Sequence, residues 1–366
     1  MSTPSDFSST RRQLLQGGVA LAASGYLPNA LAQTSSPSVR IVAASGYLTD
    51  NTRTQAGITR LQKAGFTVTN TEALFRKHLR FSGTDAQRAE DLQEVATGKV
   101  APPQLLLGAR GGYGAARLLP LVDWQRLGAR LRASGSWLMG YSDFCALQLA
   151  LLAQGHMGSF AGPFLYSEFG SPWPSAFGMQ SFIDTATGSK TGVSVTSHTS
   201  PQLDVSGTWW GGNLSVLASL VGSPYMPQID GGILFLEDVG EQPYRIERML
   251  QTLHLAGILK RQRAIVIGSF RISRVRDMYD ENYDFAAVLS HLRNVTGVPV
   301  LTDFPFGHIR EKVTMPLGFP ARLRSTNNGY TVEFLEYPKL NTAGLNLATL
   351  MEGTVGAGSG SDSEAG

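Results

Sequence analysis

The chain has 366 residues, of which 42% are hydrophobic and 16% are charged, and it contains a single cysteine. This length favours two domains, and the composition excludes a chain that is disordered throughout. The formal net charge is only +3 and no lysine or arginine run is present, so nothing indicates nucleic-acid binding. The lone Cys145 excludes an internal disulfide and any cysteine-based metal cluster.

The amino terminus has the three parts of an export signal. Arg11 and Arg12 precede a short apolar run at 17–27, and the pattern Ala-Leu-Ala at 30–32 follows as a cleavage site. Because that run is too short to cross a bilayer, we expect no membrane span in the mature protein. We predict a signal peptide over 1–32 and a periplasmic protein. The arginine pair indicates the twin-arginine route, with ordinary secretion as the alternative.

Strand and helix patterns alternate in the first part of the mature chain. Apolar runs predict strands at 39–45, 66–68, 103–107 and 137–139, and helical periodicity predicts helices at 52–64 and 84–96. This alternation is typical of βαβ units, so we predict an α/β fold with a parallel sheet. Ligand sites of such sheets lie at the carboxyl ends of the strands.

A second α/β region follows a segment of different composition. Further strands are predicted at 232–236, 264–267, 299–301 and 331–334, and further helices at 213–221, 244–256 and 284–294. Residues 164–208 are dense in proline, serine, glycine and threonine, which indicates loops and short β pieces. We therefore predict an amino-terminal domain over 39–165, an inter-domain segment over 166–208, a carboxy-terminal domain over 209–350, and a disordered tail over 351–366.

Ser142 follows the predicted strand 137–139 at a sharp turn. Gly140 permits the turn, and residues 144–154 have the pattern of a helix. A serine there presents its hydroxyl to solvent beside the amides of the helix start, which suits a nucleophile. Phe144 stands where the second glycine of G-x-S-x-G would be, and a serine that only caps a helix has the same pattern.

A glycine-rich loop at 108–114 follows the strand 103–107. Its glycines let backbone amides approach a ligand closely, as phosphate-binding loops and oxyanion holes both require. The loop lacks the G-x-G-x-x-G spacing, so the pattern gives only weak support for nucleotide binding. A simple tight turn is the alternative.

Glu237 and His308 also follow predicted strands. Glu237 comes directly after 232–236, and His308 lies in the loop after 299–301. Taken singly, the glutamate could be a capping residue and the histidine a surface residue. Taken with Ser142, they supply the base that a serine nucleophile needs and the carboxylate that orients the base. All three could meet at one rim.

Five segments resemble the successive motifs of LD-carboxypeptidases, the serine peptidase family that also contains the microcin-C immunity peptidases. They are residues 111–114 (Gly-Gly-Tyr-Gly), 140–143 (Gly-Tyr-Ser-Asp), 210–214 (Trp-Gly-Gly-Asn-Leu), 236–238 (Leu-Glu-Asp) and 307–308 (Gly-His). The match runs in order from about 39 to 347, and five linked motifs are far more specific than any one of them.

The resemblance implies a catalytic triad. Ser142 would be the nucleophile, His308 the general base and acid, and Glu237 the residue that orients the imidazole. The backbone amides of Gly112 and Asp143 would form the oxyanion hole.

The resemblance also implies a substrate and an oligomeric state. Asn213 would fall in the motif that lines the substrate cleft. The expected reaction releases the terminal D-alanine from murein tetrapeptides, needs no metal or cofactor, and is carried out by a homodimer. Arg110 and Arg310 both lie near the motifs, and either could hold the terminal carboxylate of the peptide.

Other functions stay open at this point. Within the peptidase class, the substrate could be a peptide–nucleotide antibiotic instead of murein. Outside it, the chain could be an exported peptide-binding protein without chemistry, or an oxidoreductase that binds a dinucleotide at 108–114.

Overall fold

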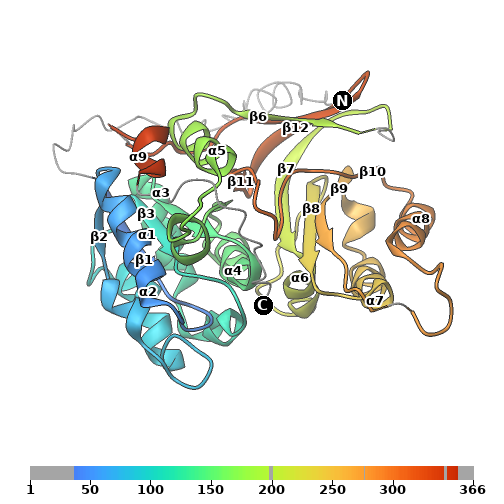
Figure 1. Cartoon of the computed structure of the whole chain (residues 1–366). Coiled ribbons are helices and arrows are strands. Elements are labelled where there is room, and N and C mark those ends of the chain that lie inside the picture. Colours follow the sequence, from blue (N-terminus) through green and yellow to red (C-terminus); the bar gives the residue numbers. More distant parts are fainter. Residues whose placement is uncertain (1–36, 198–200, 276, 342–343, 353–366) are drawn as a thin grey trace, which may run out of the picture. The chain divides into compact units, whose positions relative to one another are not determined.

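The computed structural model describes residues 37–197, 201–275, 277–341 and 344–352. These residues form two β-sheets with helices packed against them (Figure 1). The α/β fold predicted from the sequence is confirmed. The predicted signal peptide and all but the first two residues of the predicted tail lie outside the described residues. No helix within the described ranges is long and apolar enough to cross a membrane.

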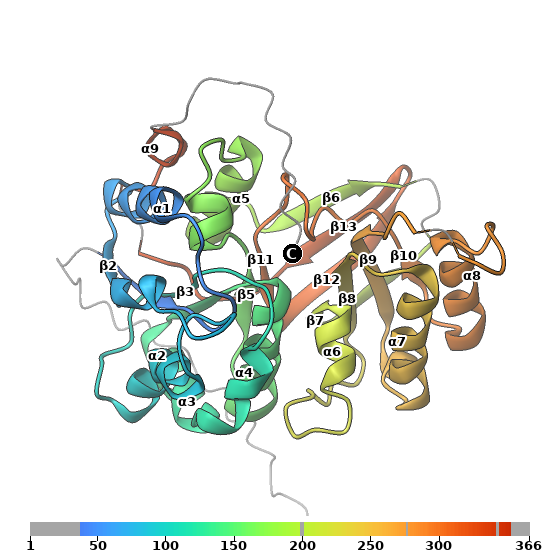
Figure 2. The same ribbon diagram turned by 60° about the horizontal axis from the view of Figure 1, so that its bottom comes forward.

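The first sheet has the strand order β11-β5-β4-β3-β1-β2. Its parallel strands are β1 (Ser38–Val42), β2 (Thr67–Thr69), β3 (Leu105–Gly108), β4 (Trp137–Gly140) and β5 (Ser159–Ala161). The connecting helices are α1 (Asn51–Lys63), α2 (Asp85–Thr97), α3 (Trp124–Ser134) and α4 (Cys145–Gly155), with 3₁₀ turns η1 (Thr71–Phe75) and η2 (Ala115–Leu121). Helix α1 lies on one face of the sheet and α2, α3 and α4 on the other (Figure 2).

The second sheet has the order β10-β9-β8-β7-β12-β13-β6. Its parallel strands are β7 (Asp204–Asn213), β8 (Ile233–Val239), β9 (Ala264–Arg271) and β10 (Val300–Leu301). Its antiparallel strands are β6 (Gly192–Thr196), β12 (Phe319–Thr326) and β13 (Gly329–Phe334). The helices are α6 (Leu214–Ser219), α7 (Pro243–Leu255) and α8 (Phe285–Thr296), with a 3₁₀ turn η5 (Leu259–Arg261).

The segment predicted to hold only loops and short β pieces contains a helix. Helix α5 (Ala176–Thr187) begins after Ser175, whose hydroxyl accepts a hydrogen bond from the Gly178 amide at 3.1 Å. It buries Met179, Phe182 and other apolar residues at helical spacing. The prediction of no helix was wrong because the proline- and serine-rich approach and the weak helix formers of α5 hide this short periodic stretch. A single π-turn, η4 (Leu165–Phe169), precedes it.

The chain returns from the second sheet to the first. Strand β11 (Met315–Leu317) pairs antiparallel with β5 at the edge of the first sheet. Helix α9 (Leu347–Met351) then packs against α1 and α5, and α4 packs against α6 and β7 (Figures 1 and 2). The domain boundaries at 165 and 208 stay predictions, since β11 and α9 come from the predicted second domain but contact the first sheet and its helices.

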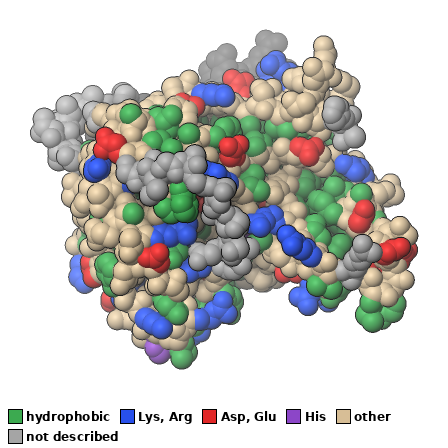
Figure 3. Space-filling view, in the orientation of Figure 1, with side chains coloured by type: hydrophobic (Ala, Val, Ile, Leu, Met, Phe, Trp, Pro, Cys, Tyr) green, Lys and Arg blue, Asp and Glu red, His purple; other side chains and the backbone are tan. Residues whose placement is uncertain are grey.

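Charged side chains of both signs share the surface. On the face drawn in Figure 3, basic and acidic side chains are interspersed among polar and apolar ones. The described residues contain no group of three or more His, Cys, Asp or Glu side chains arranged to hold a metal ion.

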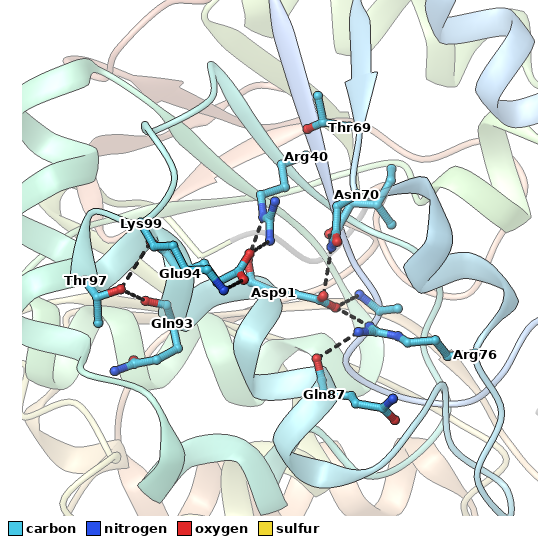
Figure 4. A network of polar contacts seen from close by, with 12 residues as sticks. Arg40, Thr69, Asn70, Arg76, Gln87, Asp91, Gln93, Glu94, Thr97 and Lys99 are labelled. Carbon is cyan, nitrogen blue, oxygen red and sulfur yellow. Dashed lines mark hydrogen bonds and ion pairs between the residues drawn. The ribbon is translucent and has the colours of Figure 1, made fainter.

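A buried polar network ties β1 to α2 and to the segment after β2 (Figure 4). At its centre is Asp91, whose side chain is 2% exposed. It accepts hydrogen bonds from Arg76 Nη2 and Asn70 Nδ2, both at 2.7 Å, and from the Ala43 amide at 3.0 Å. Burial raises the pKa of the Asp91 carboxyl, and the Arg76 guanidinium opposes that rise. Nearby, Arg40 Nη2 pairs with Glu94 at 2.6 Å.

Candidate active site

Ser142 lies on a strained turn between β4 and α4. It opens the 3₁₀ turn η3 (Ser142–Phe144), and its φ of +58° lies in the left-handed region that non-glycine residues rarely adopt. The Phe144 amide donates to the Tyr141 carbonyl at 3.1 Å and closes the turn. A serine held this way at a strand end projects its hydroxyl from the sheet, as a nucleophile requires.

The structure brings the three predicted triad residues together. Ser142 Oγ lies 2.9 Å from His308 Nε2, and His308 Nδ1 lies 2.8 Å from Glu237 Oε2. The glutamate is fully buried, and the histidine side chain is 17% exposed. Because a carboxylate can only accept, Nδ1 carries the proton and Nε2 is left to accept the serine hydroxyl proton. The arrangement can activate the serine and stabilise the imidazolium that forms.

A bulge and a glycine bring Glu237 and His308 into contact. Leu236 pairs with Ile267 and Asp238 with Phe270, so two residues of β9 stand opposite Glu237. Such a bulge redirects the side chain at the end of a strand. Gly307, with φ +144°, has no room for a side chain, since a Cβ there would lie 2.9 Å from the Ser269 carbonyl oxygen.

Asn213 contacts the triad carboxylate. It caps α6, and its Oδ1 accepts from the Val216 amide at 3.2 Å. Its Nδ2 donates to Glu237 Oε1 and to Asp238 Oδ1, both at 3.2 Å. The sequence singled out Asn213 for the substrate cleft and missed these contacts, although an asparagine before a helix signals a cap. Asn213 is only 4% exposed, and its hydrogen bond fixes the position of the Glu237 carboxylate.

A second carboxylate, Asp238, lies beside Glu237. Its Oδ2 accepts from the Ser215 amide at 2.9 Å and its Oδ1 from the Val239 amide at 2.8 Å. Burial raises the pKa of Asp238 to about 6, although the Val239 hydrogen bond opposes the rise. The neighbouring charge of Glu237 acts in the same direction as burial.

Asp143 joins the nucleophile turn to the glycine-rich loop. Its Oδ2 accepts from Ser45 Oγ at 2.6 Å and from the Ala115 amide at 2.9 Å. The loop backbone touches the nucleophile, because a Cβ on Gly111 would lie 2.9 Å from Ser142 Oγ. The structure thus places the two predicted oxyanion residues, Gly112 and Asp143, in segments that flank Ser142.

Three other residues singled out in the sequence lie apart from the triad contacts. Cys145 is buried on α4, where burial raises the pKa of its thiol to about 12. Arg110 Nη1 donates to the Tyr47 carbonyl at 3.2 Å. Arg310 is exposed, and its Nη2 donates to the Trp173 carbonyl at 3.5 Å.

Comparison with known proteins identifies the family to which this chain belongs. The LD-carboxypeptidase N-terminal domain model matches residues 39–162, and the corresponding C-terminal domain model matches residues 206–323. A putative carboxypeptidase of Streptomyces coelicolor is 32% identical over 304 residues, which cover 81% of this chain and 93% of that protein. This chain belongs to the LD-carboxypeptidase family. Its strand-end serine and the histidine beside it therefore lie in the framework of a serine carboxypeptidase.

Two further relatives extend the comparison of this LD-carboxypeptidase. The crystal structure of a muramoyltetrapeptide carboxypeptidase from Oxalobacter formigenes is 40% identical, with a TM-score of 0.75, and covers 82% of this chain and 100% of that one. The microcin C7 self-immunity protein of Escherichia coli is 26% identical and covers 79% of this chain and 90% of its own length. The predicted family is confirmed, and the protein is an enzyme of the serine carboxypeptidase class.

Proposed function

We propose that this LD-carboxypeptidase releases the terminal D-alanine from murein tetrapeptides through an acyl-enzyme. The observation that carries the proposal is the hydrogen-bonded chain from Ser142 Oγ through His308 to Glu237, at 2.9 and 2.8 Å. The substrate follows the Oxalobacter formigenes relative, whose name gives a muramoyltetrapeptide as its substrate.

The reaction runs in two halves on these residues. Ser142 Oγ attacks the carbonyl carbon of the residue before the terminal D-alanine, while its proton passes to His308 Nε2. His308 then protonates the departing amine, and D-alanine leaves the acyl-enzyme. In the second half a water molecule gives its proton to His308 and attacks the ester carbonyl. The proton returns to Ser142 Oγ, which restores the enzyme.

Two groups of residues stabilise the charges that develop. The negative oxygen of each tetrahedral intermediate accepts hydrogen bonds from the Gly112 and Asp143 amides, and each such donor contributes on the order of 3 kcal/mol in comparable sites. Glu237 stabilises the imidazolium of His308. The buried position of the carboxylate strengthens this interaction, because little water screens it.

The direct test is alanine release. Purified parent protein and Ser142→Ala are incubated with murein tetrapeptide and followed by mass spectrometry. The parent is expected to remove one alanine, and Ser142→Ala to lose several powers of ten in rate. Ser219→Ala, which alters an exposed serine on α6, serves as the matched control and should keep the parent rate. Equal turnover by the parent and Ser142→Ala would refute the nucleophile.

Peptide–nucleotide conjugates are the second candidate substrates. The observation that favours them is the likeness to the microcin C7 self-immunity protein. The same preparations are therefore offered an aminoacyl sulfamoyl nucleoside in parallel. If the parent cleaves this conjugate and leaves the tetrapeptide intact, the substrate is a peptide–nucleotide antibiotic and not murein. The proposed catalytic triad would be unaffected by that result.

We further propose that the protein acts in the periplasm as a homodimer. The export signal pattern over 1–32 supports the location, and the family resemblance supports the dimer. Deletion of 1–32 should leave the purified enzyme active and abolish its effect on wall peptide composition in cells. An unchanged wall effect would refute the location, and a monomer in light scattering would refute the dimer.

A further inference from the structure

A buried ion pair lies beside the nucleophile turn. Lys312 Nζ lies 2.6 Å from Glu168 Oε1, and the two side chains are 6% and 14% exposed. The Tyr141 hydroxyl completes the cluster, 3.2 Å from Lys312 Nζ and 2.9 Å from Glu168 Oε1. Tyr141 immediately precedes Ser142. Each of the three polar groups is thus bonded to the other two next to the reacting serine.

This cluster connects the two sheets at the point where the triad is assembled. Lys312 lies on the loop from β10 to β11, four residues after His308. Glu168 lies on η4, and Tyr141 follows β4 of the first sheet. The ion pair therefore anchors the loop that carries the histidine to the part of the molecule that carries the serine.

The Tyr141 ring also contacts the catalytic histidine directly. The centroids of Tyr141 and His308 lie 5.3 Å apart with the rings inclined by 61°, an edge-to-face arrangement. The Lys312 ammonium lies 4.6 Å from the centroid of the same tyrosine ring. The imidazole is thus supported by the ring on one side and by Glu237 at Nδ1.

Both members of the pair are charged at neutral pH. Burial alone would raise the pKa of Glu168, but Lys312 together with the hydrogen bonds from Ser167 and the Phe164 amide outweighs burial, and the pKa lies below its usual range. Burial alone would lower the pKa of Lys312, but Glu168 and Tyr141 together outweigh burial, and the pKa is raised. Glu168 Oε2 also accepts from the Phe164 amide at 2.8 Å and from Ser167 Oγ at 2.6 Å. The pair as a whole adds no net charge near the imidazole.

We propose that Lys312, Glu168 and Tyr141 are positioning residues that hold the imidazole of His308 within hydrogen-bonding distance of Ser142. The inference rests on the proposed function, which gives Ser142 and His308 their catalytic roles. A buried charged pair with its remaining hydrogen bonds satisfied has a fixed geometry. A displacement of about 1 Å at a reacting group can lower the rate by roughly 10²-fold.

Every variant keeps the other charged groups near His308, among them Asp238, whose pKa of about 6 lies within the tested range. Glu237 and Asp238 approach from β8, and Asp143 lies beside Ser142. On β9, Arg271 Nη1 donates to the His308 carbonyl at 3.2 Å. Because every variant below keeps these groups, a change in pH dependence reports the ion pair.

The experiment measures how fast a fluorophosphonate probe labels Ser142, from pH 5 to pH 9, by mass spectrometry. The probe needs only an activated serine, so its reaction does not depend on the identity of the peptide substrate. The variants are Lys312→Met, Glu168→Gln and the double variant Lys312→Met/Glu168→Gln. Ser219→Ala, which alters an exposed serine on α6 outside the cluster, is the neutral control. The double variant leaves no buried charge unpaired, which protects its folding.

The single variants should shift the acid limb of the pH profile in opposite directions. Lys312→Met leaves a negative charge that favours protonated imidazole, so the limb moves to higher pH. Glu168→Gln leaves a positive charge, and the limb moves to lower pH. The double variant should keep the parent limb but label roughly 10- to 100-fold more slowly. Ser219→Ala should stay close to the parent in both respects.

Two results would overturn the inference. One is a double variant that labels at the parent rate, and the other is single variants whose limbs move in the same direction. Alanine release from murein tetrapeptide by the same preparations tests the proposed function separately. A labelled parent that releases no alanine would refute that substrate and leave the positioning role intact. A parent whose Ser142 is not labelled would refute both.

Discussion

Two buried carboxylates, Asp91 and Glu237, show how similar burial leads to different roles. The side chains are 2% and 1% exposed, so burial does not distinguish them. Asp91 accepts hydrogen bonds from a guanidinium, an amide side chain and a backbone amide (Figure 4). Within the described part of the chain, the ion-pair partner of Glu237 is His308.

The difference lies in whether the partner carries a permanent charge. A guanidinium is not deprotonated in proteins, so the cationic partner of Asp91 has no proton to exchange. An imidazole, by contrast, can accept a proton at one nitrogen and later pass it on. In the proposed mechanism the carboxylate stabilises the charged imidazole and so lowers the cost of the proton transfer from Ser142. We therefore expect the first arrangement to serve stability and the second to serve chemistry.

Of the substitutions that test this comparison, the one at Glu237 is expected to change activity most. Glu237→Gln should lower kcat/KM for the tetrapeptide by roughly 10³- to 10⁴-fold, because the amide neither stabilises the imidazolium nor enforces its tautomer. The unfolding free energy should change far less. Steady-state kinetics and urea unfolding measure the two quantities, with the exposed Glu333→Gln as the control. A variant that keeps its activity but loses stability would make Glu237 a structural residue like Asp91.

The first sheet shows what the sequence can and cannot predict. Continuous apolar runs separated by helical periodicity identified β1, β2, β3 and β4, because most such strands are buried on both faces. The parallel strand β5 was missed, since it has only three residues. The hairpin of β12 and β13 was predicted only as a late strand near 331–334. Its residues are buried alternately, as in Ala321 and Leu323 against exposed neighbours, and the pattern is weak over so few residues. Helix α5 was missed because the proline- and serine-rich segment before it and its weak helix formers hide its periodicity.

The candidate site, too, could be predicted only in part. Ser142, Glu237 and His308 were identified because each follows a strand end and because their motifs occur together in one family. The contacts of Asn213 with Glu237 and of Lys312 with Glu168 join residues that are 24 and 144 positions apart. The first pair forms because β7 and β8 are neighbours in the second sheet, and the second forms where the chain returns to the first sheet, so no local pattern in the chain records either of them.

The next largest effect is expected on stability, from a substitution of Asp91. Asp91→Ala should lower the unfolding free energy by about 3–5 kcal/mol, because it leaves the Arg76 charge and the Ala43 amide without their buried partner. The kcat/KM of the folded protein should stay near the parent value. Glu94→Ala is the matched control, since its partly exposed pairs with Arg40 and Lys99 should cost only about 1 kcal/mol or less. Loss of activity without loss of stability would contradict the structural role of Asp91.

The smallest expected effect is a change in stability with pH, caused by the titration of Asp238 next to Glu237. The folded-state pKa of Asp238 is raised to about 6 by burial, against about 3.9 in an unfolded chain. The protonated form is thus favoured by folding, so its stabilisation is complete below about pH 3.9 and is lost as pH rises through 6. The difference corresponds to roughly 3 kcal/mol at most.

Asp238→Asn removes this titration, because the amide stays neutral at every pH. Urea unfolding of the parent and Asp238→Asn at several values between pH 4 and pH 8 therefore measures the contribution of Asp238 as the difference between two curves. Other titrating groups, Asp91 among them, are common to both proteins and cancel. The variant should gain stability relative to the parent as pH rises from 4 to 7. Two parallel curves would mean that folding leaves the pKa of Asp238 unchanged, and they would contradict the effect of burial on this carboxyl.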